Sequence, residues 1–102
     1  MGMDRLTDQV EKEARDLRIL LAVIDHGPIG IVRISEETGI PEHKVRYSLR
    51  MLENDGLIEP TPQGAVATED VDELVAEMNA GLDSLVARLE ALKGLPAEVP
   101  AE

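Results

Sequence analysis

Four basic or imidazole side chains and one tyrosine, all able to donate hydrogen bonds, fall within eight residues of this sequence. They are His43, Lys44, Arg46, Tyr47 and Arg50. Val45, Leu49 and Leu52 recur among them at four- and three-residue steps, the spacing of a helix with one apolar face. If that face packs inward, the five donors lie on the opposite, exposed face. Exposed Lys and Arg bind phosphate oxygens, and Arg can also bind a base edge through two parallel hydrogen bonds.

No other group of residues predicts a reaction or a metal site. His26 and His43 are the only histidines and cysteine is absent, so no set has transition-metal ligand spacing. No residue stands in a nucleophile motif or a glycine-rich phosphate loop. Acids gather near the start of a C-terminal helix, where negative charge is favoured, so we interpret them as a solvated face. These acids are Glu69, Asp70, Asp72, Glu73 and Glu77. We expect no enzyme, no metal and no cofactor.

The charge distribution sets the donor-rich segment apart from the rest of the chain. The net charge is −11, yet residues 26–50 carry four bases and three acids. Every other stretch is acidic, and Arg outnumbers Lys by seven to three. Acids over most of the surface are typical of proteins from halophiles, in which they serve solubility. The composition therefore favours a halophilic archaeal source.

Length and hydropathy limit the class of protein. The chain has 102 residues, and its longest unbroken apolar stretch is the six residues Ile19–Ile24, far short of a membrane span. No signal peptide pattern opens the sequence, so we expect one cytoplasmic domain that does not bind a membrane. With one aromatic residue, the core is aliphatic and modest in size. Part of the apolar surface is expected to be covered by a second copy.

Two helices are predicted before the donor-rich helix. An apolar stripe predicts a helix over residues 4–25, whose second half is apolar almost all round and whose first half projects from the domain. The stripe consists of Leu6, Val10, Ala14, Leu17, Leu21 and Ile24. His26-Gly27-Pro28 ends this helix. A short helix over 31–38 follows and stops at Gly39.

The donor-rich helix is predicted from about Pro41 to Asn54. Pro is favoured in the first helical turn, and Asn54-Asp55-Gly56 is a strong stop signal. Two short strands, 57–59 and 65–67, then form a hairpin whose tip, 60–64, carries neither Arg nor Lys. Thr68 is the expected N-cap of the last helix.

The C-terminal segment predicts a coiled-coil seam. Seven apolar residues alternate at four- and three-residue steps over three heptads, which favours dimerisation over a helix lying on its own domain. The seam is Val71, Val75, Met78, Leu82, Leu85, Leu89 and Leu92. Residues 95–102 are expected to form a disordered acidic tail. The predicted division is 1–25 for core and dimer contacts, 26–68 for the central domain, 69–94 for dimerisation and 95–102 for the tail.

The stretch from Ile34 to Ile58 resembles the winged helix-turn-helix core of archaeal and bacterial transcription regulators. The resemblance lies in the glycine turn Thr38-Gly39-Ile40, in buried Val45 and Leu49, and in the exit Leu52-Glu53-Asn54-Asp55-Gly56-Leu57-Ile58. It covers about residues 17–68. It implies a mainly α fold with a small β-hairpin wing, flanked here by long N- and C-terminal helices.

The resemblance implies a helix that enters the major groove of double-stranded DNA. On that basis Lys44 and Arg46 are candidates for base edges, and Arg50 and His43 for phosphates. Arg33 would add a phosphate contact, and Tyr47 would bind a phosphate or pack on a sugar. A homodimer would present two such helices about 34–36 Å apart, so the expected target is an inverted repeat.

Two functions remain open at this point. One is a sequence-specific, homodimeric transcription regulator. The other is an acidic winged-helix adaptor that docks a protein partner and does not bind DNA. An ion pair between Glu42 and Arg46, four residues apart, would occupy that arginine and favour a helix face that is merely solvated. The operator, the regulated genes, the sign of regulation and any small-molecule effector do not follow from the sequence.

Overall fold

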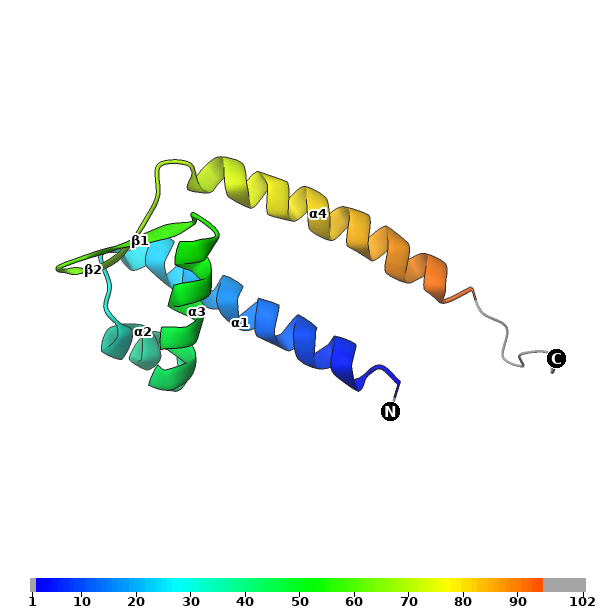
Figure 1. The fold of residues 1–102 in the computed structure, drawn as a ribbon, viewed down its shortest axis with the longest axis horizontal. Coiled ribbons are helices and arrows are strands. Elements are labelled where there is room, and N and C mark those ends of the chain that lie inside the picture. The colour runs from blue at the N-terminus through cyan, green and yellow to red at the C-terminus, as the bar shows by residue number, and fades with distance from the viewer. Residues whose placement is uncertain (1, 95–102) are drawn as a thin grey trace. The chain divides into compact units, whose positions relative to one another are not determined.

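The computed structural model describes residues 2–94, whose elements Figure 1 shows in chain order. The chain divides into two compact units, Met1–Val71 and Asp72–Glu102. The first unit holds three helices and a two-stranded hairpin, and most of one long helix belongs to the second. This confirms the mainly helical fold with one small hairpin.

Three helices form the body of the first unit. They are α1 (Asp4–His26), α2 (Ile31–Thr38) and α3 (Glu42–Asn54), all close to the predicted bounds. Gly39 ends α2 with a φ of 74°, a left-handed conformation that glycine adopts without a steric penalty. Its N–H donates to the Ser35 carbonyl at 2.8 Å. The turn between α2 and α3 is therefore fixed at the predicted glycine.

The predicted inner face of α3 is confirmed. Val45, Leu49 and Leu52 are all buried, and α3 contacts α1, α2 and the first strand of the hairpin. The remaining core side chains are aliphatic and come from α1, α2, the hairpin and the segments between elements. They are Ile19, Leu20, Ala22, Val23, Ile29, Ile34, Ile40, Leu57, Ile58 and Ala65.

The apolar stripe predicted on α1 is not its buried face. Leu21 is 58% exposed and Val10 54%, while Leu6, Ala14 and Ile24 are also exposed and only Leu17 is half-buried. The core is instead reached by a second set of α1 residues. This set is Asp16, Ile19, Leu20, Ala22 and Val23. At about 100° per residue the two sets lie on different sides of the helix. Periodicity detects both sides but cannot tell which one the rest of the chain covers.

A buried polar pair joins α1 to α3. Asp16 is 6% exposed and Ser48 is fully buried. The Ser48 hydroxyl donates to Oδ1 of Asp16 at 2.5 Å. A buried carboxylate without a partner is costly, so this hydrogen bond sets how the two helices pack.

The hairpin is longer than the sequence predicted. Its strands are β1 (Ile58–Thr61) and β2 (Gly64–Ala67), paired antiparallel so that Ile58 lies opposite Ala67 and Thr61 opposite Gly64. The tip is thus two residues and not the predicted five, 60–64. The strand extends because the Thr61 hydroxyl donates to the Gly64 carbonyl at 2.7 Å and closes the turn.

The free edge of β2 is tied to the segment after α1. Ile29 and Ala65 exchange backbone hydrogen bonds of 3.1 and 2.8 Å. Next to this bridge Gly64 has a φ of 128°, and a Cβ there would lie 2.5 Å from the carbonyl carbon of Ile29. Only glycine allows this close approach. The hairpin is therefore anchored on both sides of β2.

Thr68 does not act through its side chain as the predicted helix cap. Its hydroxyl donates to the Gly56 carbonyl at 2.7 Å, at the turn that follows α3. Its N–H donates to the Leu57 carbonyl at 3.1 Å. These bonds close the base of the hairpin, because the Gly56 and Leu57 carbonyls that follow α3 accept from the Thr68 hydroxyl and N–H.

The last helix, α4, runs from Val71 to Leu92. It contains the predicted heptad residues, and none of its side chains is buried. Leu92 is 65% exposed, and Leu82, Leu85, Val86 and Leu89 are exposed as well. The predicted acidic tail, 95–102, lies outside the described residues. Of the helices that the structure describes, none is long and apolar enough to cross a membrane.

Candidate nucleic-acid interface

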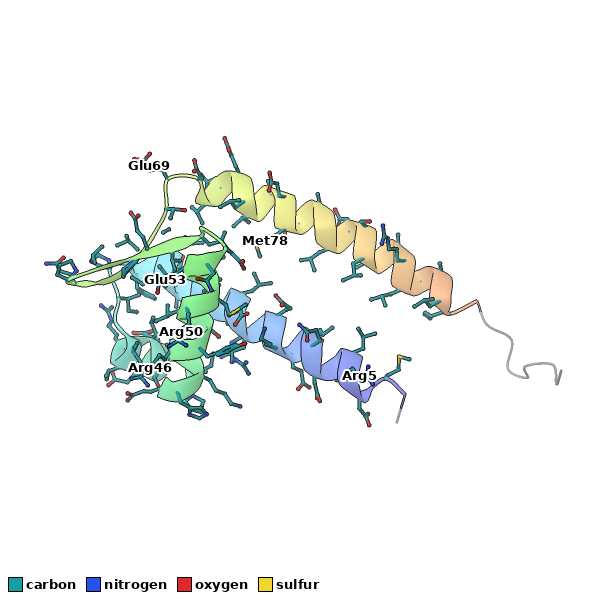
Figure 2. The ribbon with its side chains drawn as sticks, viewed as in Figure 1. Arg5, Arg46, Arg50, Glu53, Glu69 and Met78 are labelled. Carbon is teal, nitrogen blue, oxygen red and sulfur yellow. The ribbon has the colours of Figure 1, made fainter. Side chains whose placement is uncertain are left out.

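The five predicted donors of α3 are all exposed. Between them, Val45, Ser48 and Leu49 turn inward and hold the helix by its opposite side. His43, Arg46, Tyr47 and Arg50 stand at spacings of three and four residues, so they share one side of the helix. Figure 2 shows Arg46 and Arg50 along this side. The exposed side of α3 can therefore offer several hydrogen-bond donors at once to a facing surface.

Lys44 lies apart from Arg46. Residues two positions apart differ by about 200° around a helix, so these two cations point to opposite edges of α3. Lys44 instead shares an edge with Tyr47, three residues further on. The sequence prediction gave Lys44 and Arg46 the same role, and the helix geometry separates them.

Two acids border the basic side of α3. Glu42 precedes Arg46 by one turn, and Glu53 follows Arg50 by three residues; Figure 2 shows Glu53 on the same side as both arginines. Within residues 2–94, no ion pair joins either arginine to either acid. The guanidinium groups are thus not occupied by the pairing considered above.

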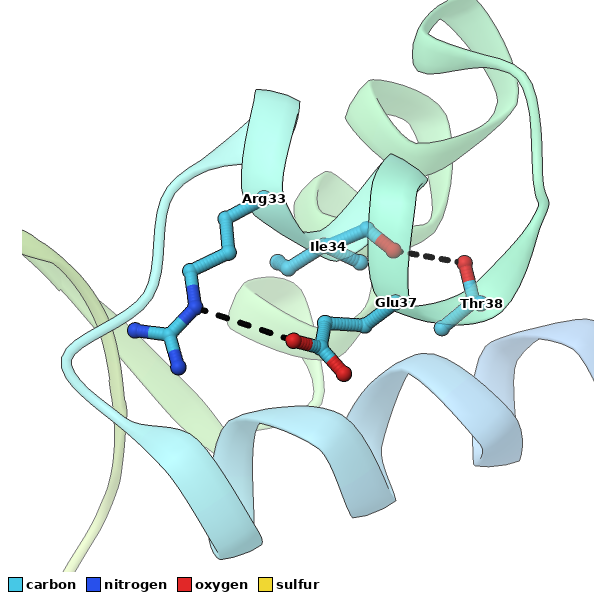
Figure 3. A network of polar contacts seen from close by, with 4 residues as sticks. All are labelled: Arg33, Ile34, Glu37 and Thr38. Atoms are coloured by element: carbon cyan, nitrogen blue, oxygen red, sulfur yellow. Dashed lines mark hydrogen bonds and ion pairs between the residues drawn. The ribbon is translucent and has the colours of Figure 1, made fainter.

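Arg33 is on α2 and is not brought into the α3 face. Its Nε lies 3.9 Å from Oε1 of Glu37, one helical turn away, and both side chains are about half exposed. Figure 3 shows the pair on the side of α2 that faces α1. An exposed ion pair of this length is weak, so the guanidinium can exchange partners.

The turn that sets the angle between α2 and α3 is held by side chains that the sequence reasoning did not single out. The Thr38 hydroxyl donates to the Ile34 carbonyl at 2.7 Å, as Figure 3 shows, and accepts from the Ile40 N–H at 3.2 Å. The Ser35 hydroxyl donates to the Ile40 carbonyl at 2.6 Å. Arg18 of α1 donates from Nη2 to the Thr38 carbonyl at 2.7 Å and so caps the negative end of α2.

Lys12 of α1 also reaches α3 and was missed by the sequence analysis. Its Nζ lies 5.4 Å from the centre of the Tyr47 ring, a cation–π distance. The two residues are 35 positions apart, and helix periodicity alone does not reveal which turn of α1 lies against α3. The contact places a further cation beside those of α3 itself.

Comparison with known families bears on this arrangement directly. Residues 12–59 match the family model described as winged helix-turn-helix DNA-binding. The fold is a winged helix-turn-helix. Within it, α2, the Gly39 turn and α3 form the helix-turn-helix, and β1 and β2 form the wing.

The solved structures contain a similar winged helix-turn-helix arrangement. The activation domain of the phage T4 transcription factor MotA aligns with a TM-score of 0.52 and 20% sequence identity, over 72% of this chain and 78% of that one. At this identity the likeness concerns the fold alone. No curated protein matches the chain.

The wing of this winged helix-turn-helix contributes no positive charge at its tip. The turn residues Pro62 and Gln63 are exposed and uncharged. Residues 2–94 also hold no group of three or more His, Cys, Asp or Glu suited to a metal ion. This winged helix-turn-helix therefore offers a ligand mainly the basic side chains described above, which lie on α1, α2 and α3.

Proposed function

We propose that this protein is a sequence-specific transcription regulator that binds double-stranded DNA by laying α3 in the major groove. The observation that carries the proposal is the exposed side of α3, where Arg46 and Arg50 stand one turn apart and unpaired with the acids beside them. An α-helix fits the major groove, and an arginine can bind guanine O6 and N7 together. The match to a DNA-binding family model supports this use of the helix.

The helix geometry suggests a division of roles on α3. We assign Arg46 and Arg50 to base edges because they share one strip of the helix. Lys44, on the opposite edge, and His43, at the start of the helix, are assigned to phosphates. Arg33 remains a predicted phosphate contact that must first leave Glu37. Phosphate contacts fix register and affinity, whereas base contacts determine sequence preference.

We further propose that the protein acts as a homodimer on an inverted repeat. The heptad residues of α4 are the dimer seam, with Leu82, Leu85 and Leu89 exposed in the single chain. The exposed stripe of α1 is a second apolar surface that a partner subunit would cover. Since one α3 offers few cations and the wing tip offers none, two subunits are needed for a useful affinity.

The acidic composition supports a cytoplasmic protein of a halophilic archaeon. A net charge of −11 on 102 residues would keep the chain soluble at high salt. It also makes non-specific binding to nucleic acid weak. Recognition would thus depend on the few cations of the α3 face.

A fluorescence polarisation titration against DNA from upstream of the protein's own gene tests the proposal. The arms are wild type, Arg46→Ala/Arg50→Ala and Lys44→Ala. We expect the double variant to lose about 100-fold in affinity for the preferred sequence and little for unrelated DNA. Lys44→Ala should weaken both by a similar factor.

The control is Arg88→Ala/Lys93→Ala, which removes one cation from α4 and one just after it and leaves α3 intact. It should bind like wild type. A wild-type protein without sequence preference at any workable salt concentration would refute the regulator proposal and favour the adaptor alternative.

A further inference from the structure

Lys12 and Tyr47 form a contact between helices that the proposed use of α3 does not by itself require. The ammonium group of Lys12 stands over the Tyr47 ring at 5.4 Å from its centre. Tyr47 is 45% exposed, and Lys12 is half-buried. In the part of the chain that the structure describes, no ion pair joins Lys12 to an acid.

The contact between Lys12 and Tyr47 lies at one edge of α3. Tyr47 and Lys44 are three residues apart and share this edge, and Lys44 is about 200° around the helix from Arg46. Lys12 adds a cation to the same edge from α1. A helix in the major groove has a phosphate strand along each of its edges, because the groove is only about 12 Å wide. The edge with Lys44, Tyr47 and Lys12 would thus face one of the two strands.

We propose that Lys12 is a DNA backbone contact that the Tyr47 ring holds in place. This inference rests on the proposed function of α3. An ammonium group has three N–H donors, and a ring on one side leaves the others free for a phosphate oxygen. Lysine loses much rotamer freedom when it is fixed, and the ring contact removes part of that cost before DNA arrives. Tyr47 then acts chiefly as a positioning residue.

The alternative is that Lys12 and Tyr47 only help α1 pack on α3. The two roles differ in their salt dependence. Removing one cation that binds a phosphate reduces the slope of log affinity against log salt by about 0.9, which is about eightfold in affinity near 0.1 M salt. Removing a cation that serves packing alone lowers the melting temperature and leaves that slope unchanged.

The experiment measures binding over a range of salt concentrations for Lys12→Gln, Lys12→Arg, Tyr47→Phe and Tyr47→Leu, with melting temperatures alongside. Lys93→Gln is the matched control, since it removes the same charge from an exposed site that follows α4. We expect Lys12→Gln to weaken preferred and unrelated DNA about eightfold per subunit and to reduce the slope. Lys12→Arg and Tyr47→Phe should keep the slope, and Tyr47→Leu should lower affinity.

Two results would count against Lys12 alone, and a third would count against DNA binding by the protein. If the wild type binds DNA and Lys12→Gln leaves the salt slope unchanged, the role of Lys12 alone is overturned, whether or not the melting temperature falls. A slope reduced equally by Lys93→Gln would overturn it too, because the effect would then be one of net charge. Absence of wild-type binding would instead refute the DNA-binding proposal itself.

Discussion

The two arginines of α3 are flanked by carboxylates. The proposed affinity for DNA therefore depends on the balance between these neighbouring charges. Glu42 and Glu53 are exposed and not ion-paired to Arg46 or Arg50 in the described residues. Acids close to a phosphate strand repel it, although salt screens the repulsion beyond about 10 Å at 0.1 M. The acids thus restrain binding and limit the contribution of non-specific contacts.

Replacing Glu53 by Gln should tighten DNA binding. We expect about a two- to fivefold gain in affinity at low salt, which fades as salt rises, because one repulsive charge is removed near the phosphates. Polarisation titrations at several salt concentrations measure the gain. Glu90→Gln makes the same charge change on α4, and an equal gain there would show that only net charge matters.

Among the elements, α1 and α3 are joined by a buried hydrogen bond between Ser48 and Asp16, in addition to their apolar contacts. Ser48→Ala should leave the Asp16 carboxylate buried without this donor and cost about 1–3 kcal/mol of unfolding free energy. Urea denaturation measures the loss. The double variant Asp16→Ala/Ser48→Ala should be about as stable as Asp16→Ala alone, because no buried carboxylate is then left without its donor. Additive effects of the two changes would show that the bond contributes little.

The hairpin depends on the close approach of Gly64 to Ile29. Gly64→Ala would put a Cβ against the Ile29 backbone at a positive φ, so we expect a loss of about 2–4 kcal/mol in stability. Gly30→Ala, at the residue after Ile29, is the control, because a Cβ there meets no atom within 4 Å. Thermal unfolding should separate the two variants clearly, and equal melting temperatures would contradict the proposed anchoring.

A helix or strand is predicted well when the residues that determine it act locally on the backbone, and poorly when distant contacts determine it. The bounds of α2 and α3 were predicted well because Gly39, Pro41 and Gly56 act locally on the backbone. The second half of α1 lies inside the domain as expected, but the apolar stripe is not its buried side, because two apolar sides compete and only tertiary contacts choose between Leu21 and Ile19. The roles of Asp16, Arg18 and Lys12 were missed because each acts on a residue at least 20 positions away. The exposure of the α3 donors was predictable, because the spacing of Val45, Leu49 and Leu52 sets the buried side.

For the whole molecule, the exposed leucines of α4 are the basis of the proposed dimer. Leu85→Asp places a charge in the seam, so we expect a monomer at micromolar concentration in analytical ultracentrifugation and a large loss of affinity for an inverted repeat. Ala87→Asp adds the same charge on the opposite side of α4 and should leave the dimer intact. A wild-type monomer at that concentration would contradict the seam.

Salt should act on the whole molecule in two opposite ways. Screening weakens the mutual repulsion of a chain with a net charge of −11 and should raise its melting temperature between about 0.1 and 1 M salt. The same change should lower DNA affinity, because releasing counterions into a more concentrated salt solution is less favourable. Thermal unfolding in KCl and in sucrose of matched osmolality separates screening from solute exclusion. A melting temperature that does not rise with KCl would contradict this expectation.

Tyr47 is the only aromatic residue in the chain, and it lies on the proposed DNA-binding side of α3. All intrinsic ultraviolet emission of the protein therefore comes from one ring beside Lys12. Quenching of that emission during a DNA titration would report contact at this position without a label. By the same reasoning, near-ultraviolet circular dichroism reflects the environment of this half-exposed ring, and it gives no view of the aliphatic core.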